Sequence, residues 1–255
     1  MAKVIAIANQ KGGVGKTTTS INLAASLART RRRIMLVDID PQGNATMGSG
    51  VDKDAAAVTT YEVLIGDVRV PQARLSVEGG YDLVPSNSSL SGAEVELIGL
   101  EQREYRLRLA LQAILGEYDY VLIDCPPALN LLTVNALVAA QAVMIPMQCE
   151  YYALEGLTAL MNTIRKVRQG LNPGLQIAGL LRTMFDPRNN LSNEVSAQLK
   201  DHFGDKLYRT IIPRNVRLAE APSFGKPVIS YDMQSKGAQA YLALAGEILR
   251  REHAA

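Results

Sequence analysis

The chain contains 255 residues, 47% of them hydrophobic, and its formal net charge is +2. This length and apolar content can bury one substantial core, so we expect a single domain over residues 1–255. The nearly balanced charge excludes nucleic-acid binding through overall charge, and any such binding needs local basic patches. No apolar run approaches the roughly 20 residues of a membrane span, so no membrane association is expected. Two cysteines, Cys125 and Cys149, and an N-terminus without a signal-like segment predict a cytoplasmic protein.

The first predicted elements are a strand over Val4–Ala8 and a helix over Ser20–Ala28, joined by a glycine-rich loop. Three glycines let the loop turn its N–H groups inward, and the helix adds its positive end, which together make a cradle for phosphate oxygens. Lys16 can reach terminal phosphates, and the Thr17 hydroxyl can hold a magnesium ion that bridges them. The sequence therefore predicts that a nucleoside triphosphate is bound by Lys11, Gly12, Gly13, Val14, Gly15, Lys16, Thr17 and Thr18.

This loop departs from the strict phosphate-loop pattern at its start. Gln10 stands where the first glycine is expected, and an additional lysine, Lys11, follows it. One nucleotide is already served by Lys16, so we interpret Lys11 as a residue that reaches phosphates held by another molecule. The alternative is that Lys11 is a solvated surface lysine.

Two aspartates follow the next predicted strand, Ile34–Val37, whose continuous apolar run is typical of a buried parallel sheet. Asp38 and Asp40 then lie at the carboxyl end of that strand, where ligands of open α/β sheets collect. Asp38 either contributes to such a site or caps a turn, and the sequence leaves both interpretations open.

The middle of the chain gives weaker signals. Residues 45–80 show little pattern apart from a short helix near Thr60–Leu64, and no chemistry is assigned to them. The segment Ser91–Glu94 resembles a capping box, which predicts a helix from there to about Leu115 with a break at Gly99.

A second strong signal lies at residues 118–127, where an apolar strand ends in Asp124 and a proline turn follows at once. Phosphate-loop enzymes place the carboxylate beside their magnesium ion in this way. Strands that end in aspartate are common, but the combination with the loop at residues 11–18 is specific. Asp124 is therefore predicted to be a magnesium ligand.

Strands and helices alternate through the rest of the chain. Strands are predicted over Tyr81–Pro85, Ala142–Met147 and Leu175–Leu181, and helices over Leu131–Ala140, Leu154–Arg168 and Gly237–Arg251. This alternation predicts βαβ crossovers, and hence an α/β fold with a mostly parallel twisted sheet and helices on both faces.

The loop from Lys11 to Thr18 resembles the deviant Walker A box of the ParA/MinD family of P-loop ATPases, and the whole chain fits that family. The resemblance implies that ATP is the nucleotide and that Lys11 crosses a dimer interface to the partner's ATP. It also implies that Asp40 orients the attacking water. The catalytic residues implied are thus Lys11, Lys16 and Asp40, and the magnesium site comprises Thr17, Asp40 and Asp124.

Basic residues gather at Arg29–Arg33, at Arg165–Arg168 and between Lys206 and Arg217, and the first cluster is interpreted as a solvated face. The segment 211–217 in the third cluster resembles the family's segment for base and DNA contacts. By this resemblance, Pro213 and Asn215 lie by the adenine, and the DNA-binding arginines are Arg214 and Arg217.

The function implied by the resemblance is ATP-dependent partition of a chromosome or plasmid. An ATP-bound homodimer would bind duplex DNA without sequence preference, and hydrolysis would release it. A ParB-type centromere-binding partner would speed an otherwise slow reaction, and the protein would associate with the nucleoid in the cytoplasm.

Three other functions on the same scaffold remain as alternatives. A MinD-like membrane ATPase should end in a basic amphipathic helix, whereas the helix at Gly237–Arg251 has the pattern of a packing helix. A reductase resembling the nitrogenase iron protein would use cluster cysteines, but buried structural thiols are expected at Cys125 and Cys149. A metabolic ligase such as the biotin-pathway enzyme would need a second substrate pocket, of which the sequence gives no sign. His202 and His253 are expected on the surface.

Overall fold

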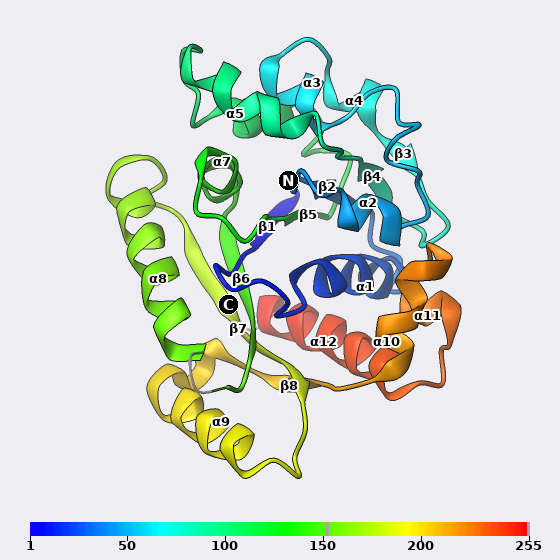
Figure 1. The fold of residues 1–255 in the computed structure, drawn as a ribbon, viewed down its shortest axis with the longest axis vertical. Coiled ribbons are helices and arrows are strands. Elements are labelled where there is room, and N and C mark those ends of the chain that lie inside the picture. The colour runs from blue at the N-terminus through cyan, green and yellow to red at the C-terminus, as the bar shows by residue number, and fades with distance from the viewer. Residues whose placement is uncertain (151–152, 254–255) are drawn as a thin grey trace.

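A computed structural model describes residues 1–150 and 153–253, and one twisted sheet organises them (Figure 1). Its eight strands run in the order β3-β4-β2-β5-β1-β6-β7-β8. All neighbouring pairs are parallel except β3 and β4, which are antiparallel. The strands are β1 (Lys3–Ile7), β2 (Ile34–Asp38), β3 (Leu75–Ser76), β4 (Asp82–Val84), β5 (Tyr120–Asp124), β6 (Ala142–Gln148), β7 (Gln176–Phe185) and β8 (Leu207–Pro213).

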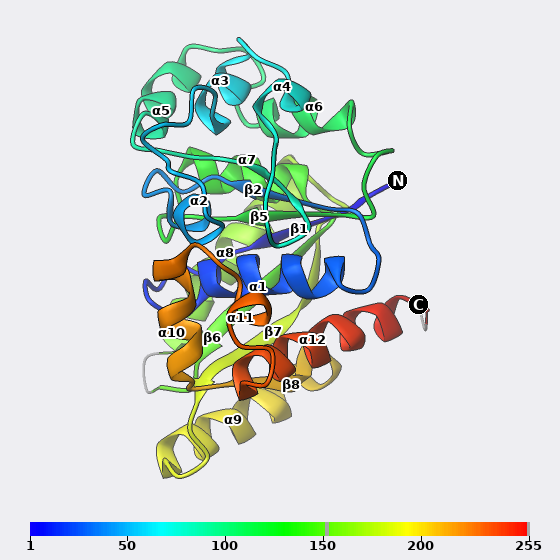
Figure 2. The same cartoon turned by 90° about the vertical axis from the view of Figure 1, so that its right-hand side faces the viewer.

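Helices cover both faces of the sheet (Figure 2). The α-helices are α1 (Lys16–Ala28), α2 (Asn44–Gly48), α3 (Thr60–Ile65), α4 (Val70–Ala73), α5 (Leu90–Ile98), α6 (Arg106–Gln112), α7 (Leu131–Ala139), α8 (Ala153–Gly170), α9 (Asn190–Phe203), α10 (Val216–Glu220), α11 (Val228–Tyr231) and α12 (Lys236–His253). Two short 3₁₀ turns lie at Gly204–Lys206 and Ala221–Phe224. The predicted α/β fold, with its mostly parallel sheet, is confirmed.

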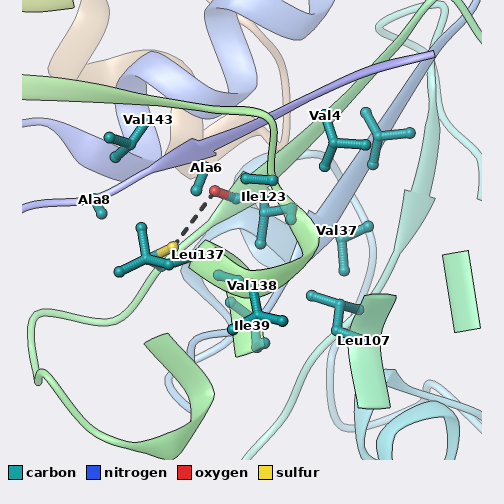
Figure 3. Close-up of a cluster of buried hydrophobic side chains, with 14 of the residues drawn as sticks. Val4, Ala6, Ala8, Val37, Ile39, Leu107, Ile123, Leu137, Val138 and Val143 are labelled. Atoms are coloured by element: carbon teal, nitrogen blue, oxygen red, sulfur yellow. Dashed lines mark hydrogen bonds between the residues drawn. The ribbon is translucent and has the colours of Figure 1, made fainter. Parts of the chain in front are cut away.

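The apolar runs of the central strands are explained by burial on both faces. Successive side chains of a strand point to opposite faces, and in β1 Val4 and Ala6 belong to one core while Ile5 and Ile7 belong to the other. Figure 3 shows Val4, Val143 and other strand residues of the first core together with helix residues such as Leu137. Both cores consist mainly of buried aliphatic side chains, and the second core also contains buried tyrosines such as Tyr81 and Tyr241.

The predicted helix at 91–115 is interrupted as expected but begins differently. It consists of α5 and α6, and Gly99 caps the end of α5. The prediction of a capping box at Ser91–Glu94 was wrong. The turn Asn87–Leu90 continues directly into α5 and places Ser91 inside the helix. A reciprocal capping box lies instead at the start of α3, between Thr59 and Glu62.

The last helix, α12, packs against α1 and β8, as its pattern predicts. Tyr241, Leu244 and Ile248 are buried in the second core, and the Tyr241 hydroxyl lies 3.1 Å from Thr19 Oγ1. Its apolar side is therefore occupied by the protein's own core. None of the helices in the described parts of the chain combines the length and apolar character needed to cross a membrane.

Candidate functional site

The phosphate cradle predicted at residues 11–18 lies between the carboxyl end of β1 and the start of α1. Gly13 and Gly15 adopt left-handed φ angles of 73° and 84°, which glycine tolerates best. The loop is fixed from neighbouring strands: Thr183 Oγ1 donates to the Val14 carbonyl over 2.7 Å, and Asn9 Nδ2 donates to the Pro146 carbonyl over 2.7 Å. The glycine loop is thus fixed at the helix N-terminus, where backbone N–H groups can donate hydrogen bonds to an anion.

Lys16 begins α1 and is buried, with only 7% of the residue exposed. Its ammonium donates to the Lys11 carbonyl over 3.1 Å. Burial lowers the pKa of Lys16, and the nearby carboxylates of Asp124 and Asp40 oppose this shift. A buried ammonium beside a glycine loop is suited to neutralise phosphate charge, because burial strengthens its interaction with an anion.

Asp124 ends β5 beside the loop and accepts two hydroxyl hydrogen bonds. Thr17 Oγ1 donates to Oδ2 over 2.8 Å, and Ser20 Oγ donates to Oδ1 over 2.7 Å. Burial raises the pKa of Asp124 to about 6, and the two hydroxyls oppose that shift. The structure therefore brings together Thr17 and Asp124, as predicted. Ser20 was missed, although its spacing from Lys16 and Thr17 places all three on neighbouring turns of one helix.

Asp38 and Asp40 have different surroundings at the end of β2. Asp38 is fully buried and pairs in register with Asp124. Its carboxylate accepts from the Asp40 N–H and from both the N–H and hydroxyl of Thr46, over 3.1, 2.8 and 2.7 Å. Burial and the neighbouring Asp124 raise the pKa of Asp38 to about 7. These contacts favour the turn-capping interpretation of Asp38, since they hold the loop that carries Asp40.

Asp40 is 6% exposed, and one of its carboxylate oxygens accepts from the Gln42 N–H over 3.0 Å. Its charge contributes to the raised pKa of Asp124 and opposes the lowering of the Lys16 pKa by burial. Further support comes from Ser86, whose hydroxyl donates to the Asp40 carbonyl over 2.8 Å. The Asp40 carboxylate is thus largely buried, and the backbone of its own turn holds its orientation.

The oxygen donors of this site fit a magnesium ion. Thr17, Asp40 and Asp124 offer only hydroxyl and carboxylate oxygens, which Mg²⁺ prefers. Within residues 1–150 and 153–253 no cluster of three or more His, Cys, Asp or Glu side chains is arranged to hold a metal. A protein site with few carboxylates suits magnesium, which usually keeps water and phosphate ligands beside one or two carboxylates.

Lys11 lies at the exposed side of the cradle and forms an ion pair that the sequence did not predict. Its ammonium lies 2.6 Å from Glu150 Oε2, two residues after β6. The two residues are 139 positions apart, so no local pattern could have linked them. Lys11 is therefore not simply solvated, and its position in this structure is set by a carboxylate of its own chain.

The segment predicted for base and DNA contacts lies at the carboxyl end of β8, at the same edge of the parallel sheet as the cradle. Pro213 ends β8, and Asn215 caps α10 by accepting from the Leu218 N–H over 3.3 Å. Arg214 is exposed. Arg217 forms ion pairs with Glu220 at 2.8 Å and Asp232 at 3.3 Å. Strands β6 and β7 lie between β8 and β1, the strand that leads into the cradle.

Both cysteines are buried and unpaired, as expected. Burial raises the pKa of the Cys149 thiol to about 11 and raises that of Cys125 further still, which makes both thiols unreactive. His202 is exposed on α9, as expected. His253 is the last residue of α12.

Known proteins resemble this chain over nearly its full length. A family model described as an AAA domain matches residues 2–177. The chain is 55% identical over 253 residues to the chromosome partitioning protein ParA of Caulobacter vibrioides, an alignment that covers 98% of this chain and 95% of that protein. It is 54% identical over 249 residues to the sporulation initiation inhibitor protein Soj of Bacillus subtilis, covering 97% of this chain and 98% of that one.

A solved structure from Mycobacterium smegmatis, described as cobyrinic acid a,c-diamide synthase with bound ADP and magnesium, has a TM-score of 0.87 to this chain. It is 40% identical and covers 99% of this chain and 96% of its own. The chain is also 53% identical over 253 residues to the chromosome partitioning protein ParA of Myxococcus xanthus, an alignment that covers 99% of this chain and 89% of that protein. The chain therefore belongs to the ParA/Soj family of chromosome-partitioning P-loop ATPases.

Proposed function

We propose that residues 1–255 form one ATPase domain that partitions DNA by binding it when ATP is bound and releasing it on hydrolysis. The observation that carries this proposal is the cradle with two lysines, Lys11 and Lys16, beside the hydroxyl–carboxylate pair of Thr17 and Asp124. This cradle occurs in a chain more than half identical to ParA and Soj. The cargo, a chromosome or a plasmid, is then DNA held without sequence preference.

In this proposal each residue of the site has one task. The N–H groups of residues 12–18 and the Lys16 ammonium hold the phosphates of ATP. Thr17, Asp40 and Asp124 would hold a magnesium ion, which would supply positive charge beside the phosphates when bound. Asp40 orients the water that attacks the γ-phosphate. Ser20 and the Thr17 hydroxyl hold the Asp124 carboxylate in place, at 2.7 and 2.8 Å.

The proposed cycle depends on two copies of the chain. Lys11 of each protomer reaches the other's ATP, so that ATP holds the dimer together. Pro213 and Asn215 lie by the adenine, while Arg214 and Arg217 contact phosphates of duplex DNA. Such contacts carry no sequence information and weaken steeply with salt. A ParB-type partner accelerates hydrolysis, and the protein is found on the nucleoid in the cytoplasm.

Two features disfavour the alternatives. The apolar side of α12 is buried in the second core, so this helix has no apolar face left for lipid. The amide-synthase name of the Mycobacterium smegmatis structure calls for a second substrate site. A cavity of about 1170 Å³ is lined by Leu207–Thr210 in the first half of β8, whereas the cradle lies at the carboxyl ends of the strands.

The test uses Asp40→Ala protein, which should bind ATP yet hydrolyse it poorly. Binding to a random-sequence duplex is followed by fluorescence anisotropy with ATP and with ADP, over a salt series. Anionic liposomes serve as a parallel ligand in a sedimentation assay. DNA binding that requires ATP and fades with salt is expected. Sedimentation with liposomes in place of DNA binding would support a MinD-like function, and binding to neither would direct attention to a soluble substrate.

A further inference from the structure

An ion pair between Lys11 and Glu150 joins the phosphate cradle to the segment after β6. Both side chains are partly exposed, at 37% for Lys11 and 51% for Glu150. The loop is already attached to β6 by Asn9, whose Nδ2 donates to the Pro146 carbonyl, and to β7 by Thr183. The ion pair is therefore not needed to fix the loop, and an exposed pair contributes little to stability. Its main effect is on where the Lys11 ammonium lies.

The backbone of Lys11 is held independently of its side chain. Its N–H donates to Asn9 Oδ1 over 3.0 Å, and its carbonyl accepts from Lys16 Nζ over 3.1 Å. The side chain can thus exchange one partner for another while the loop stays unchanged. In this structure the partner is Glu150 Oε2 of the same chain.

A carboxylate at this position competes with phosphate for the same cation. The Glu150 carboxylate lies 2.6 Å from the Lys11 ammonium and neutralises its charge. Phosphate oxygens carry the same sign of charge as Glu150, so both groups cannot gather around one ammonium without repulsion. A phosphate that Lys11 binds on a second copy of the chain therefore competes with Glu150 for the ammonium.

We propose that Glu150 is a restraint on Lys11 that opposes ATP-dependent pairing of two copies of this chain. The inference rests on the proposed function, in which Lys11 reaches the partner's ATP. Glu150 divides Lys11 into a paired form and a released form, and only the released form supports the dimer. The apparent affinity of one copy for the other is then the intrinsic affinity multiplied by the fraction of chains in which Lys11 is released. A symmetric dimer needs two released lysines, so this reduction enters twice.

The expected size follows from the exposure of the pair. Exposed ion pairs shift an equilibrium by about 1.5- to fivefold. Because two pairs break in each dimer, Glu150→Gln should strengthen ATP-dependent dimerisation by roughly two- to 25-fold. The gain should shrink as salt rises, since salt screens exposed pairs.

A matched control exists at the other end of the sheet. Glu117 forms an ion pair with Arg74, and the two side chains are 47% and 33% exposed, close to the values for Glu150 and Lys11. Glu117→Gln removes the same charge from a similar surface pair without contact to Lys11. It should leave dimerisation unchanged.

The experiment has two measurements. Sedimentation velocity, with a non-hydrolysable ATP analogue and Mg²⁺, gives the dimer dissociation constant for the wild type, Glu150→Gln and Glu117→Gln. Acetylation of lysines in nucleotide-free protein, followed by mass spectrometry, gives the labelling rate of Lys11 without any dimer. Faster labelling of Lys11 and tighter dimers in Glu150→Gln alone would support the restraint.

The contrary results are separable. If the wild type dimerises with the analogue but Glu150→Gln dimerises equally or more weakly, or labels Lys11 at the wild-type rate, the restraint is overturned and the proposed function stands. If the wild type binds the analogue but stays monomeric at every concentration, the proposed dimer fails and the restraint fails with it.

Discussion

Charged side chains are buried near the carboxyl end of β5 and exposed near the carboxyl end of β8. At β5, the charged groups of Lys16, Asp38 and Asp124 are buried, and each carboxylate accepts at least two hydrogen bonds. Beyond β8, Arg214 and Arg217 are exposed, and Arg217 is paired with surface carboxylates. Buried charges must be held by fixed partners because an unpaired one is costly, whereas exposed pairs exchange at little cost. The first region suits a ligand of defined geometry, and the second suits replaceable contacts to phosphate.

The largest effect is expected from Lys16→Ala at the buried end. The ammonium is the cation of the cradle, and its removal leaves phosphate charge unbalanced in a buried site. ATP hydrolysis should fall by roughly 100-fold or more. Steady-state phosphate release measures this loss. Lys200→Ala, an exposed residue of α9, is the control and should keep the wild-type rate; full hydrolysis by Lys16→Ala would remove the cradle from the mechanism.

A second test uses the two buried carboxylates of nucleotide-free protein without magnesium. Burial raises the pKa of Asp124 to about 6 and that of Asp38 to about 7, from the ordinary value of 3.8. Between about pH 4 and pH 7 the folded state therefore holds more protons than the unfolded state. The free energy of unfolding of the protein should fall as pH rises through this range. Asp124→Asn removes one of the charges. The free energy of unfolding of this variant at pH 8 should exceed that of the wild type by about 1–3 kcal/mol.

The pH dependence of that difference is the decisive measurement. The stabilisation by Asp124→Asn should shrink towards pH 5, because the wild-type carboxyl becomes protonated there. Urea titrations at pH 5 and pH 8 measure both values. A variant that is less stable than the wild type at pH 8 would show that hydrogen bonds to the Asp124 carboxylate outweigh the cost of its burial.

A smaller effect is expected at the exposed end. Under the proposed function, Arg217→Ala should weaken DNA binding by roughly threefold at low salt and reduce the slope of log affinity against log salt by about 1. Anisotropy over a salt series measures both quantities. Arg32→Ala, in the cluster interpreted as a solvated face, is the control. Equal losses in the two variants would indicate a general charge effect instead of a contact at Arg217.

The smallest effect concerns the partner of Arg217. Glu220 neutralises this arginine through an ion pair at 2.8 Å. Glu220→Gln keeps the size of the side chain and removes one of the two ion pairs of the guanidinium, the other being with Asp232, so DNA affinity should rise by up to about twofold. The same anisotropy assay applies. Weaker binding by Glu220→Gln would mean that the pair orients Arg217 for DNA.

Much of the candidate site could be predicted because its signals are local. The glycines, Lys16 and Thr17 are adjacent in the chain, and Asp124 directly follows an apolar strand. The capping box at Ser91 failed for a local reason as well, since three residues of turn before Leu90 were enough to start the helix earlier. Helical spacing could have placed Ser20 on the same side of its helix as Lys16 and Thr17. No local pattern could have shown that Ser20 donates to Asp124.

The sequence by itself determined the strand–loop–helix cradle, the alternation of strands and helices, and the packing character of the last helix. These follow from the size, polarity and backbone freedom of residues close together in the chain. Only the tertiary structure decided that Asp38 caps a turn beside Asp124, that Glu150 holds Lys11, and that Glu220 and Asp232 hold Arg217. Strand order and register bring distant residues such as Lys11 and Glu150 together, and a charged side chain takes whichever partner lies within reach after folding.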